Sequence, residues 1–253
     1  MWSLYDDLIN GIPEDIIIDD FNLGIHWTNV KTNENAGVAL TVKGHSRPIL
    51  IQESLKGMPL KKAAKKIKSW NFEEASFGMA AINSYYNDFR KVEKLPGFKL
   101  DSSPEEGSHQ KDAFVSYADK VKGKKVAVIG HFPAIEKQFG DICELSILER
   151  NPSKGDYPDS ACEYILPEQD FVFITGMTFT NKTLPRLLQI INKNAEVSLV
   201  GPSVPLAPVL FDYGITNLSG YIVTKQDKVD EIIRSGGQFT LFDGGKMVSL
   251  DKI

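Results

Sequence analysis

The chain has 253 residues, of which 42% are apolar and 25% charged, the balance of an ordinary globular protein rather than a disordered or fibrous one. Its 29 Lys and Arg against 33 Asp and Glu give a net charge of −4, which argues against nucleic acid as the main partner. No apolar run approaches the ~20 residues of a membrane helix, the N-terminus lacks the basic start of a secretory signal, and two cysteines cannot form a disulfide framework. We therefore expect a cytoplasmic protein with no membrane partner; its oligomeric state is not readable from these features.

The first part of the chain, residues 1–95, predicts an α+β domain. Residues 1–10 are expected to form a short helix, and β-type residues that alternate within 16–31 and 37–43 predict a pair of strands. Apolar residues at helical spacing predict two further helices, near 60–68 and over 72–90.

Two polar features of this part each allow two interpretations. Lysines fill the rest of the 60–68 helix, which is typical of a solvated basic face and also fits an anion-binding surface. On the 72–90 helix, a small and polar stripe that contains Asn83 borders the apolar stripe. It predicts either the edge of a cleft or a boundary that faces water.

The second part of the chain has a different pattern. Residues 96–110 are rich in Pro, Gly and Ser, and we expect a linker there. Within 111–253, helix-compatible stretches separate short apolar runs at 126–129, 143–148, 171–174, 197–200 and 220–223. This alternation predicts an α/β domain with a mainly parallel sheet covered by helices. Most of the runs end in Gly or a polar residue, at the strand ends where open α/β sheets bind their ligands.

The first of these strand ends carries half of a nucleotide-binding signature. Gly130 follows the strand, but the glycines that complete the dinucleotide fingerprint are missing. Glu149 lies 19 residues further on, where an acidic residue commonly accepts hydrogen bonds from ribose hydroxyls. The pair fits a nucleoside-like or other hydroxyl-bearing ligand better than NAD, with an ordinary exposed strand-end charge as the alternative for Glu149.

His131 directly follows the same strand. Its ordinary pKa of ~6.5 suits a proton carrier or a metal ligand, and a packing or capping role is the alternative. The other histidines and the two cysteines show none of the spacings of a zinc site. A bound metal would therefore need oxygen ligands or a small molecule that brings its own donors.

Three later segments supply further candidates. Asp156, in a polar loop that Pro and Gly keep out of helix, is expected to contact substrate unless it merely faces solvent. Thr175, Thr178 and Asn181 surround a predicted helix start, which suits an anion or carboxylate and equally suits simple capping. The 201–208 loop, rich in proline, could form a rigid wall for a planar ligand.

Seven segments together resemble the heavy-metal chelation family, in chain order 35–37, 78–83, 127–131, 148–152, 155–158, 175–181 and 201–206. The resemblance covers nearly the whole chain. It implies an enolase N-terminal-like domain over 1–95, a Rossmann-like domain over 111–253 and a site where the two meet. It also implies a role in metal homeostasis, through condensation or hydrolysis of a pterin-, flavin- or siderophore-like metabolite. The cofactor stays open, with a metal ion carried by a small chelating ligand as the candidate.

On this basis His131 and Glu149 are the expected catalytic residues, with His131 as the proton carrier. Glu149 and Asn181 would orient the ligand, while Asn35 and Asn83 close the pocket. The full set of expected substrate-binding residues is Asn35, Asn83, Gly130, Phe132, Asp156, Thr175, Gly176, Thr178, Asn181, Gly201, Pro202 and Ser203. Two alternatives remain open: a non-catalytic binder or sensor of a metal–chelate complex, and an S-adenosylmethionine-dependent methyltransferase-like protein.

Overall fold

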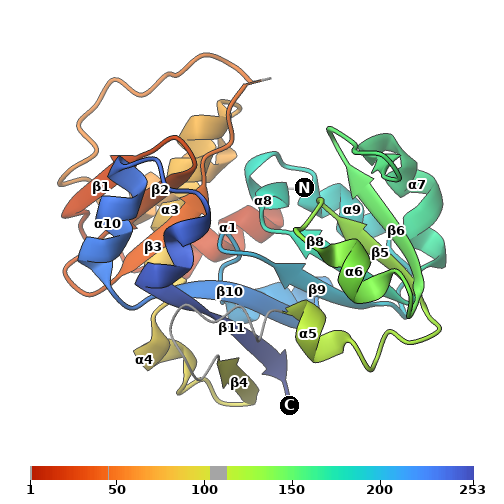
Figure 1. Cartoon of the computed structure of the whole chain (residues 1–253). Coiled ribbons are helices and arrows are strands. Elements are labelled where there is room, and N and C mark those ends of the chain that lie inside the picture. The colour runs from red at the N-terminus through yellow and green to blue at the C-terminus, as the bar shows by residue number, and fades with distance from the viewer. Residues whose placement is uncertain (1, 45, 103–112) are drawn as a thin grey trace.

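A computed structural model describes residues 2–44, 46–102 and 113–253. The chain forms two sheets, a small antiparallel one and a large, mainly parallel one, with helices around both (Figure 1). The predicted α/β class with a mainly parallel sheet is therefore confirmed. No helix in the described ranges is long and apolar enough to cross a membrane.

The small sheet comes from the first part of the chain. Its elements are α1 (Ser3–Asn10), β1 (Asp20–Leu23), β2 (Trp27–Lys31), β3 (Ala36–Leu40), α2 (Leu60–Ala64), the 3-10 helix η1 (Lys65–Lys68), α3 (Phe72–Tyr86) and α4 (Phe89–Val92). β2 is the central strand and pairs antiparallel with both β1 and β3. The predicted helix at the N-terminus is present. The 16–31 segment, predicted to supply one strand of a pair, forms two strands, β1 and β2, and β2 pairs with β3. The predicted 60–68 helix is α2 continued by η1, and the predicted 72–90 helix ends at Tyr86, before α4.

Helix α3 is buried on more than one side. Asn71 caps its first turn by accepting the Glu74 N–H at 2.8 Å. A Cβ added to Gly78 would lie 2.1 Å from the Ile67 nitrogen, and one added to Gly37 would lie 2.0 Å from the Ser84 nitrogen, so both neighbours approach the helix backbone closely. The polar stripe of α3 therefore does not face water; Asn83 is fully buried against β3.

The large sheet has the strand order β4-β11-β10-β9-β8-β5-β6-β7. Its strands are β4 (Phe98–Ser102), β5 (Lys125–Ile129), β6 (Glu144–Glu149), β7 (Tyr157–Pro158), β8 (Phe171–Thr175), β9 (Glu196–Val200), β10 (Asn217–Val223) and β11 (Gly245–Lys252). The six strands from β10 to β7 are parallel, and β11 and β4 run antiparallel to their neighbours. All five predicted apolar runs form strands of this sheet.

One strand lies where the sequence predicts a linker. β4 falls inside 96–110 and pairs with β11 along its whole length. As an edge strand it has one neighbour, and polar residues are common on such strands. A segment whose composition is typical of a linker therefore contains a strand. The rest of the predicted linker, 103–110, lies outside the described residues.

Helices cover both faces of the large sheet. They are α5 (Ala113–Tyr117), α6 (Ile135–Phe139), α7 (Cys162–Ile165), α8 (Met177–Thr180), α9 (Leu184–Ile190) and α10 (Gln226–Arg234), with 3-10 turns η2 (Asp159–Ala161), η3 (Leu166–Glu168), η4 (Pro208–Tyr213) and η5 (Phe239–Gly244). On one face, Phe139 and Phe173 meet with ring centroids 5.5 Å apart beneath α5 and α6. On the other face, Phe179 and Leu184 from α8 and α9 pack on strand residues that alternate with these.

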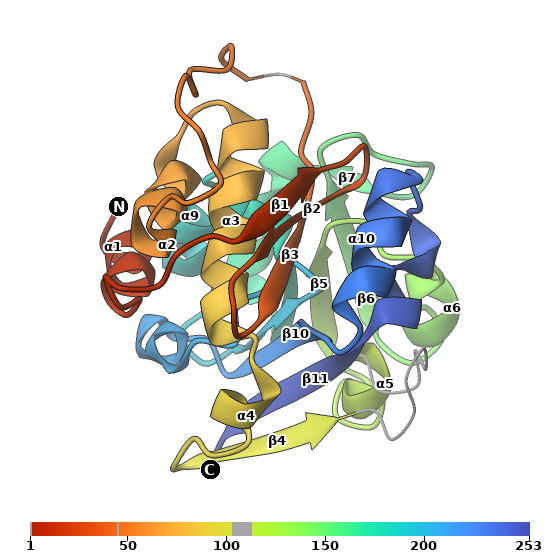
Figure 2. The same ribbon diagram turned by 90° about the vertical axis from the view of Figure 1, so that its left-hand side faces the viewer.

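The two parts of the chain are joined by buried polar contacts. Helix α10, from the second part, lies on the face of the small sheet opposite α3 (Figures 1 and 2). There Asp230 accepts hydrogen bonds from Asn29 and Lys31, both at 2.7 Å. Asn87, at the end of α3, donates to the Val204 and Tyr221 carbonyls at 3.0 Å each. The division into 1–95 and 111–253 stays a prediction. Val229 and Ile233 of α10 lie in one buried cluster with residues of both sheets.

Candidate functional site

The predicted strand ends lie side by side at one edge of the large sheet. β9, β8, β5 and β6 are consecutive in the sheet and parallel, so their carboxyl ends meet. Backbone hydrogen bonds continue past the strands: Gly130 N–H to Leu148 O at 2.9 Å, and Gly176 N–H to Val200 O at 3.0 Å. This edge is where an open α/β sheet most often binds a ligand.

The strongest cluster of chemical groups at this edge consists of His131, Glu136 and Asp156, called the acid–histidine cluster below. The Nδ1 atom of His131 lies 2.9 and 3.1 Å from the two carboxylate oxygens of Asp156. Its Nε2 atom lies 3.2 Å from Glu136 Oε1. The Asp156 side chain is 1% exposed, whereas those of His131 and Glu136 are 28% and 53% exposed. A ligand in solution can therefore reach Nε2 and Glu136.

Unusual backbone conformations bring these three residues together. Gly130 has φ +99°, which turns the chain sharply after β5. Ala134 has φ +62°, rare for a residue with a Cβ, and it starts α6 so that Glu136 returns toward His131. Gly155, with φ +104°, bends the loop after β6 just before Asp156. The sequence pattern alone does not reveal the turn at Ala134.

The electrostatics of the cluster favour a protonated histidine. The hydrogen bond that His131 donates to Asp156 raises the pKa of His131, and the charges of Asp156, Glu136 and Glu149 act in the same direction, while desolvation opposes them. Asp156 is itself held by the Ser153 N–H at 2.8 Å. When the imidazole is neutral, the contact with Asp156 favours the tautomer with its proton on Nδ1, so that Nε2 is the nitrogen with the free lone pair.

Glu149 supports the turn that carries His131. One of its carboxylate oxygens accepts the His131 N–H at 3.0 Å, and the other accepts the N–H groups of Arg150 and Asn151 at 2.7 and 3.2 Å. The structure therefore brings Glu149 and His131 together, whereas the predicted role of Glu149 in orienting a ligand stays a prediction. The hydrogen bonds to Glu149 are made by the protein's own backbone, and this describes a positioning role.

The donor atoms of the cluster fit a divalent transition metal to which the protein supplies only some of the ligands. One ligand atom from each of His131, Glu136 and Asp156 can be chosen so that all lie within 4.8 Å of one another. With Asp156 bonded to Nδ1, Nε2 and Glu136 are the atoms free to bind a metal, and a carboxylate behind the imidazole is the usual second contact of a metal-bound histidine. Imidazole with carboxylate suits zinc, nickel or iron.

The two thiols lie elsewhere. Cys143 precedes β6 at the opposite end of that strand and donates to the Phe139 carbonyl at 3.3 Å. Cys162 is buried in α7, and burial raises its pKa to about 11. Neither belongs to the metal-ligand group found among the described residues. A purely thiolate site of the kind that soft metals prefer is therefore not present in the described part of the chain.

A second group of predicted residues lies together where β5, β8 and β9 end. A Cβ added to Gly130 would lie 3.1 Å from the Cβ of Thr175, and one added to Gly201 would lie 4.0 Å from the Phe132 ring. Gly201 has φ +116°. The glycines at these two strand ends therefore allow Thr175 and Phe132 to lie close to the backbone.

The residues from the first part of the chain contact the 201–206 loop. Asn83 donates from Nδ2 to the Val38 carbonyl at 2.7 Å and lies 3.5 Å from the Pro202 carbonyl, while its Oδ1 is buried without a partner. Ser203 accepts the Leu40 N–H at 2.9 Å. Gly176 packs against the backbone of Ser203. The orphaned Oδ1 of Asn83 is a polar atom that a ligand or water donor would satisfy.

Three other predicted residues use their polar atoms within the chain. Asn35 donates to the Ser84 and Asn87 carbonyls at the end of α3, both at 3.1 Å. Thr178 donates to the Thr175 carbonyl at 2.7 Å. Asn181 accepts both the N–H and the hydroxyl of Thr183, which forms a two-residue turn before α9 and is not a helix cap. Their roles toward a ligand stay predictions.

Sequence reasoning missed two residues. Glu136 lies five positions after His131, a spacing that helix geometry does not place together without the left-handed turn at Ala134. Lys182 follows Asn181, has φ +65° and lies over the rings of Trp70 and Phe72. Burial lowers its pKa to about 8. Only its position directly after a predicted site residue could have drawn attention to it.

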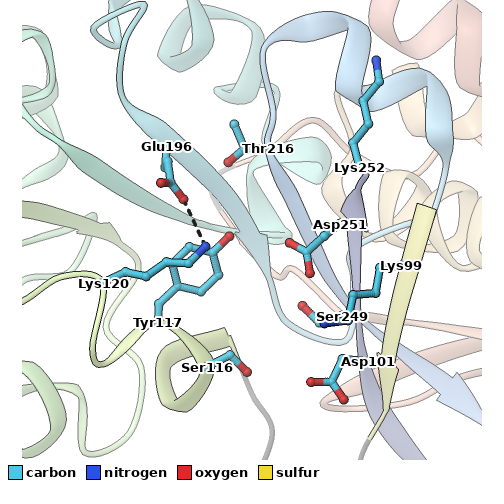
Figure 3. Close-up of a pocket in the computed structure, with 10 residues that line it drawn as sticks. All are labelled: Lys99, Asp101, Ser116, Tyr117, Lys120, Glu196, Thr216, Ser249, Asp251 and Lys252. Atoms are coloured by element: carbon cyan, nitrogen blue, oxygen red, sulfur yellow. Dashed lines mark ion pairs between the residues drawn. The ribbon is translucent and has the colours of Figure 1, made fainter. Parts of the chain in front are cut away.

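A larger hollow lies at the other end of the strands. It measures about 440 Å³ and lies between α5, the start of β9 and the paired strands β11 and β4 (Figure 3). Lys120 and Glu196 form an ion pair of 3.7 Å across it. None of the predicted site residues lines it. A smaller cavity of about 230 Å³ adjoins Glu136 and Asp156 and therefore belongs to the acid–histidine cluster.

Known proteins are similar to this chain over nearly its whole length. A crystal structure of a protein with unknown function from Desulfitobacterium hafniense DCB-2 is similar with a TM-score of 0.89 at 41% identity, over 100% of this chain and 99% of that one. Another, from Pyrococcus horikoshii, has a TM-score of 0.77 at 22% identity over 99% and 98%, and shares the fold. An uncharacterized protein of Methanocaldococcus jannaschii is 27% identical over 94% of this chain and 91% of its own length.

Two family models with one description match the chain, over residues 112–250 and 5–86. Together they span the small sheet and the large sheet with its acid–histidine cluster, except for β4 and the last two residues of β11. The chain therefore belongs to the family described as "Putative heavy-metal chelation".

Proposed function

We propose that the protein binds a divalent metal ion that a small organic chelator carries, with His131 and Glu136 as the protein's ligands to the metal. The observation that carries this proposal is the geometry around His131: a buried carboxylate holds Nδ1, and a second carboxylate lies 3.2 Å from Nε2. Two protein donors leave most positions of a transition metal open. The chelator would supply the remaining donors.

The site residues differ in what they do for the metal. Nε2 of His131 and a carboxylate oxygen of Glu136 would contact it. Asp156 is a positioning residue that orients the imidazole, and Glu149 holds the backbone of the turn. A positioning partner of this kind typically contributes about 10–100-fold to metal affinity.

Cobalt(II) binding tests the proposal, because the visible spectrum of the ion reports its ligands. We expect wild-type protein to bind one equivalent, and His131→Ala and Glu136→Gln to bind at least about tenfold more weakly. Glu144→Gln is the matched control, since it removes an exposed carboxylate at the start of β6, the end of that strand away from the cluster. Equal affinity in wild type and both site variants would overturn the proposal.

A catalytic role is the second candidate, and the Asp156–His131 pair favours it. A histidine whose Nδ1 is held by a carboxylate is a common general base, and such proton transfer is worth typically ~10²–10⁴-fold in rate. The reaction would be hydrolysis or condensation of a pterin-, flavin- or siderophore-like metabolite. A thermal-shift screen of such compounds followed by mass spectrometry tests it. Product that disappears in His131→Ala supports catalysis, whereas stoichiometric binding without product supports a carrier or sensor.

A further inference from the structure

The cavity of about 230 Å³ beside the acid–histidine cluster has a chemistry of its own. It lies between α6, β6 and the loop after β6, with Glu136 and Asp156 on its wall. Its volume equals that of roughly eight water molecules at about 30 Å³ each in the liquid. This is below the range of about 300–1,000 Å³ typical of sites for drug-sized ligands. It suits a small acid or one arm of a larger chelator, not a whole flavin.

The cavity wall carries two carboxylates and one ammonium group. Glu136 and Asp156 both belong to the acid–histidine cluster, where a metal ion and the imidazole would balance them. Lys154 is the remaining charged group of the lining, and it forms no ion pair within the described ranges. It therefore offers an ammonium group that no carboxylate of the described protein neutralises.

The rest of the wall is apolar. Leu145 and Ile147 alternate along β6 and present their side chains to the same face of the sheet. Gly155, next to Lys154, has φ +104°, a conformation in which a residue with a side chain would be strained. The lining thus combines a short hydrocarbon surface, one cation and the open side of a metal site.

We propose that Lys154 selects a carboxylate-bearing chelator, so that the ligand of this site is an anionic metal complex. This inference rests on the proposed function and adds the class of ligand. The metal would lie at His131 and Glu136, a carboxylate of the chelator would lie against Lys154, and its hydrocarbon part would lie on Leu145 and Ile147. A bare metal ion needs no ammonium group beside it, whereas an anionic complex does.

Calorimetric titration with two nickel probes separates these cases. One probe is Ni²⁺ alone, and the other is nickel nitrilotriacetate, an anionic complex in which the chelator leaves two coordination positions open. The variants are Lys154→Ala, Lys154→Glu and Lys154→Arg. Lys137→Ala is the matched control, because Lys137 is exposed on α6 next to Glu136 but does not line the cavity.

We expect Lys154→Ala to weaken nickel nitrilotriacetate by about fivefold, the upper end of what one partly exposed charge pair contributes. Lys154→Glu should weaken it further, and Lys154→Arg and Lys137→Ala should keep the wild-type affinity. Bare Ni²⁺ should bind Lys154→Ala no more weakly than wild type and Lys154→Glu more tightly, because loss or reversal of a neighbouring positive charge favours a cation. The loss should shrink in about 1 M salt, where the Debye length is about 3 Å.

Other results overturn the inference in distinguishable ways. Unchanged binding of nickel nitrilotriacetate by Lys154→Ala overturns the role of Lys154 and leaves the metal site in place. An equal loss for both probes means that Lys154 acts on the structure of the site rather than on the charge of the ligand, and this also overturns it. If wild-type protein binds neither probe, the proposed function fails first and the inference fails with it.

Discussion

The Nδ1 atom of His131 lies 2.9 Å from a carboxylate oxygen of Asp156, a residue 25 positions later whose side chain is almost wholly buried. This contact is the main cause of the raised pKa of His131. Replacing Asp156 with Asn keeps the size of the side chain and removes its charge. We expect the pKa of His131 to fall in Asp156→Asn, which an NMR titration of the imidazole protons would measure in metal-free protein.

The same contact makes stability depend on pH. A histidine with a raised pKa stabilises the fold fully below its ordinary pKa of about 6.5, and this stabilisation is lost as the pH rises through the raised value. The difference in unfolding free energy between wild type and Asp156→Asn should therefore be larger in acid than in alkali. Asp159→Asn is the control, because Asp159 pairs with Arg150 and not with His131. A His131 titration that is the same in wild type and Asp156→Asn would contradict the assignment.

Asn87 joins the two parts of the chain, and its loss should destabilise the whole fold. Its side chain donates to the Val204 and Tyr221 carbonyls and accepts the Leu206 N–H at 2.8 Å. Asn87→Ala removes three buried hydrogen bonds between the side chain and the backbone, and we expect a loss of roughly 3 kcal/mol in urea unfolding. Asn192→Ala, which removes one local turn contact, should cost less than about 1 kcal/mol. Equal costs would argue against a joining role for Asn87.

Glu74 should make the protein sensitive to acid. Its buried carboxylate accepts the N–H groups of Leu50 and Ile51 and the hydroxyl of Ser69. Desolvation acts to raise the pKa of Glu74, but these hydrogen bonds and the charge of Lys66 outweigh it, so the pKa is lowered. The stabilisation is present above the ordinary Glu pKa of about 4.3 and is lost as the pH falls through the lowered value.

We therefore expect Glu74→Gln to lower the melting temperature at neutral pH and to match wild type in strong acid. Thermal unfolding followed by circular dichroism over a range of pH would show this convergence. Glu73→Gln, at the neighbouring position of α3, should leave the pH dependence of wild type unchanged. A constant offset between wild type and Glu74→Gln at every pH would refute this explanation.

Lys182 should make the stability of the protein depend on pH in the alkaline range. Burial lowers its pKa to about 8, so between that value and its ordinary pKa of about 10.4 the unfolded chain binds a proton that the folded chain does not. Stability then rises with pH in this window. We expect the unfolding free energy of wild type to rise relative to that of Lys182→Met between about pH 8 and pH 9.5. Lys193→Met, an exposed lysine after α9, is the control.

Much of the fold follows from local patterns. The five apolar runs of the second part became strands β5, β6, β8, β9 and β10 because continuous apolar sequences between helix-compatible stretches have few other ways to be buried. β4 and β11 were not predicted. Both belong to the antiparallel edge of the large sheet, where pairing with a neighbour matters more than composition.

Some features of the candidate site are likewise visible in the sequence, and others are not. That His131 follows a buried parallel strand is visible in the sequence, and so is the polar loop that contains Asp156. Their contact depends on the path of that loop. The approach of Glu136 depends on a left-handed Ala134, a conformation that residue type disfavours and the surrounding structure imposes.

The α/β class, the parallel sheet and the strand end that carries His131 follow from the amino-acid sequence, because burial periodicity and strand-end chemistry are local properties. The lining of one small cavity by Glu136, Asp156 and Lys154, and the contacts of Asn87 and Asp230 between the two parts of the chain, emerge only in the folded protein. They depend on residues far apart in the chain, or on turns whose backbone angles no local pattern encodes.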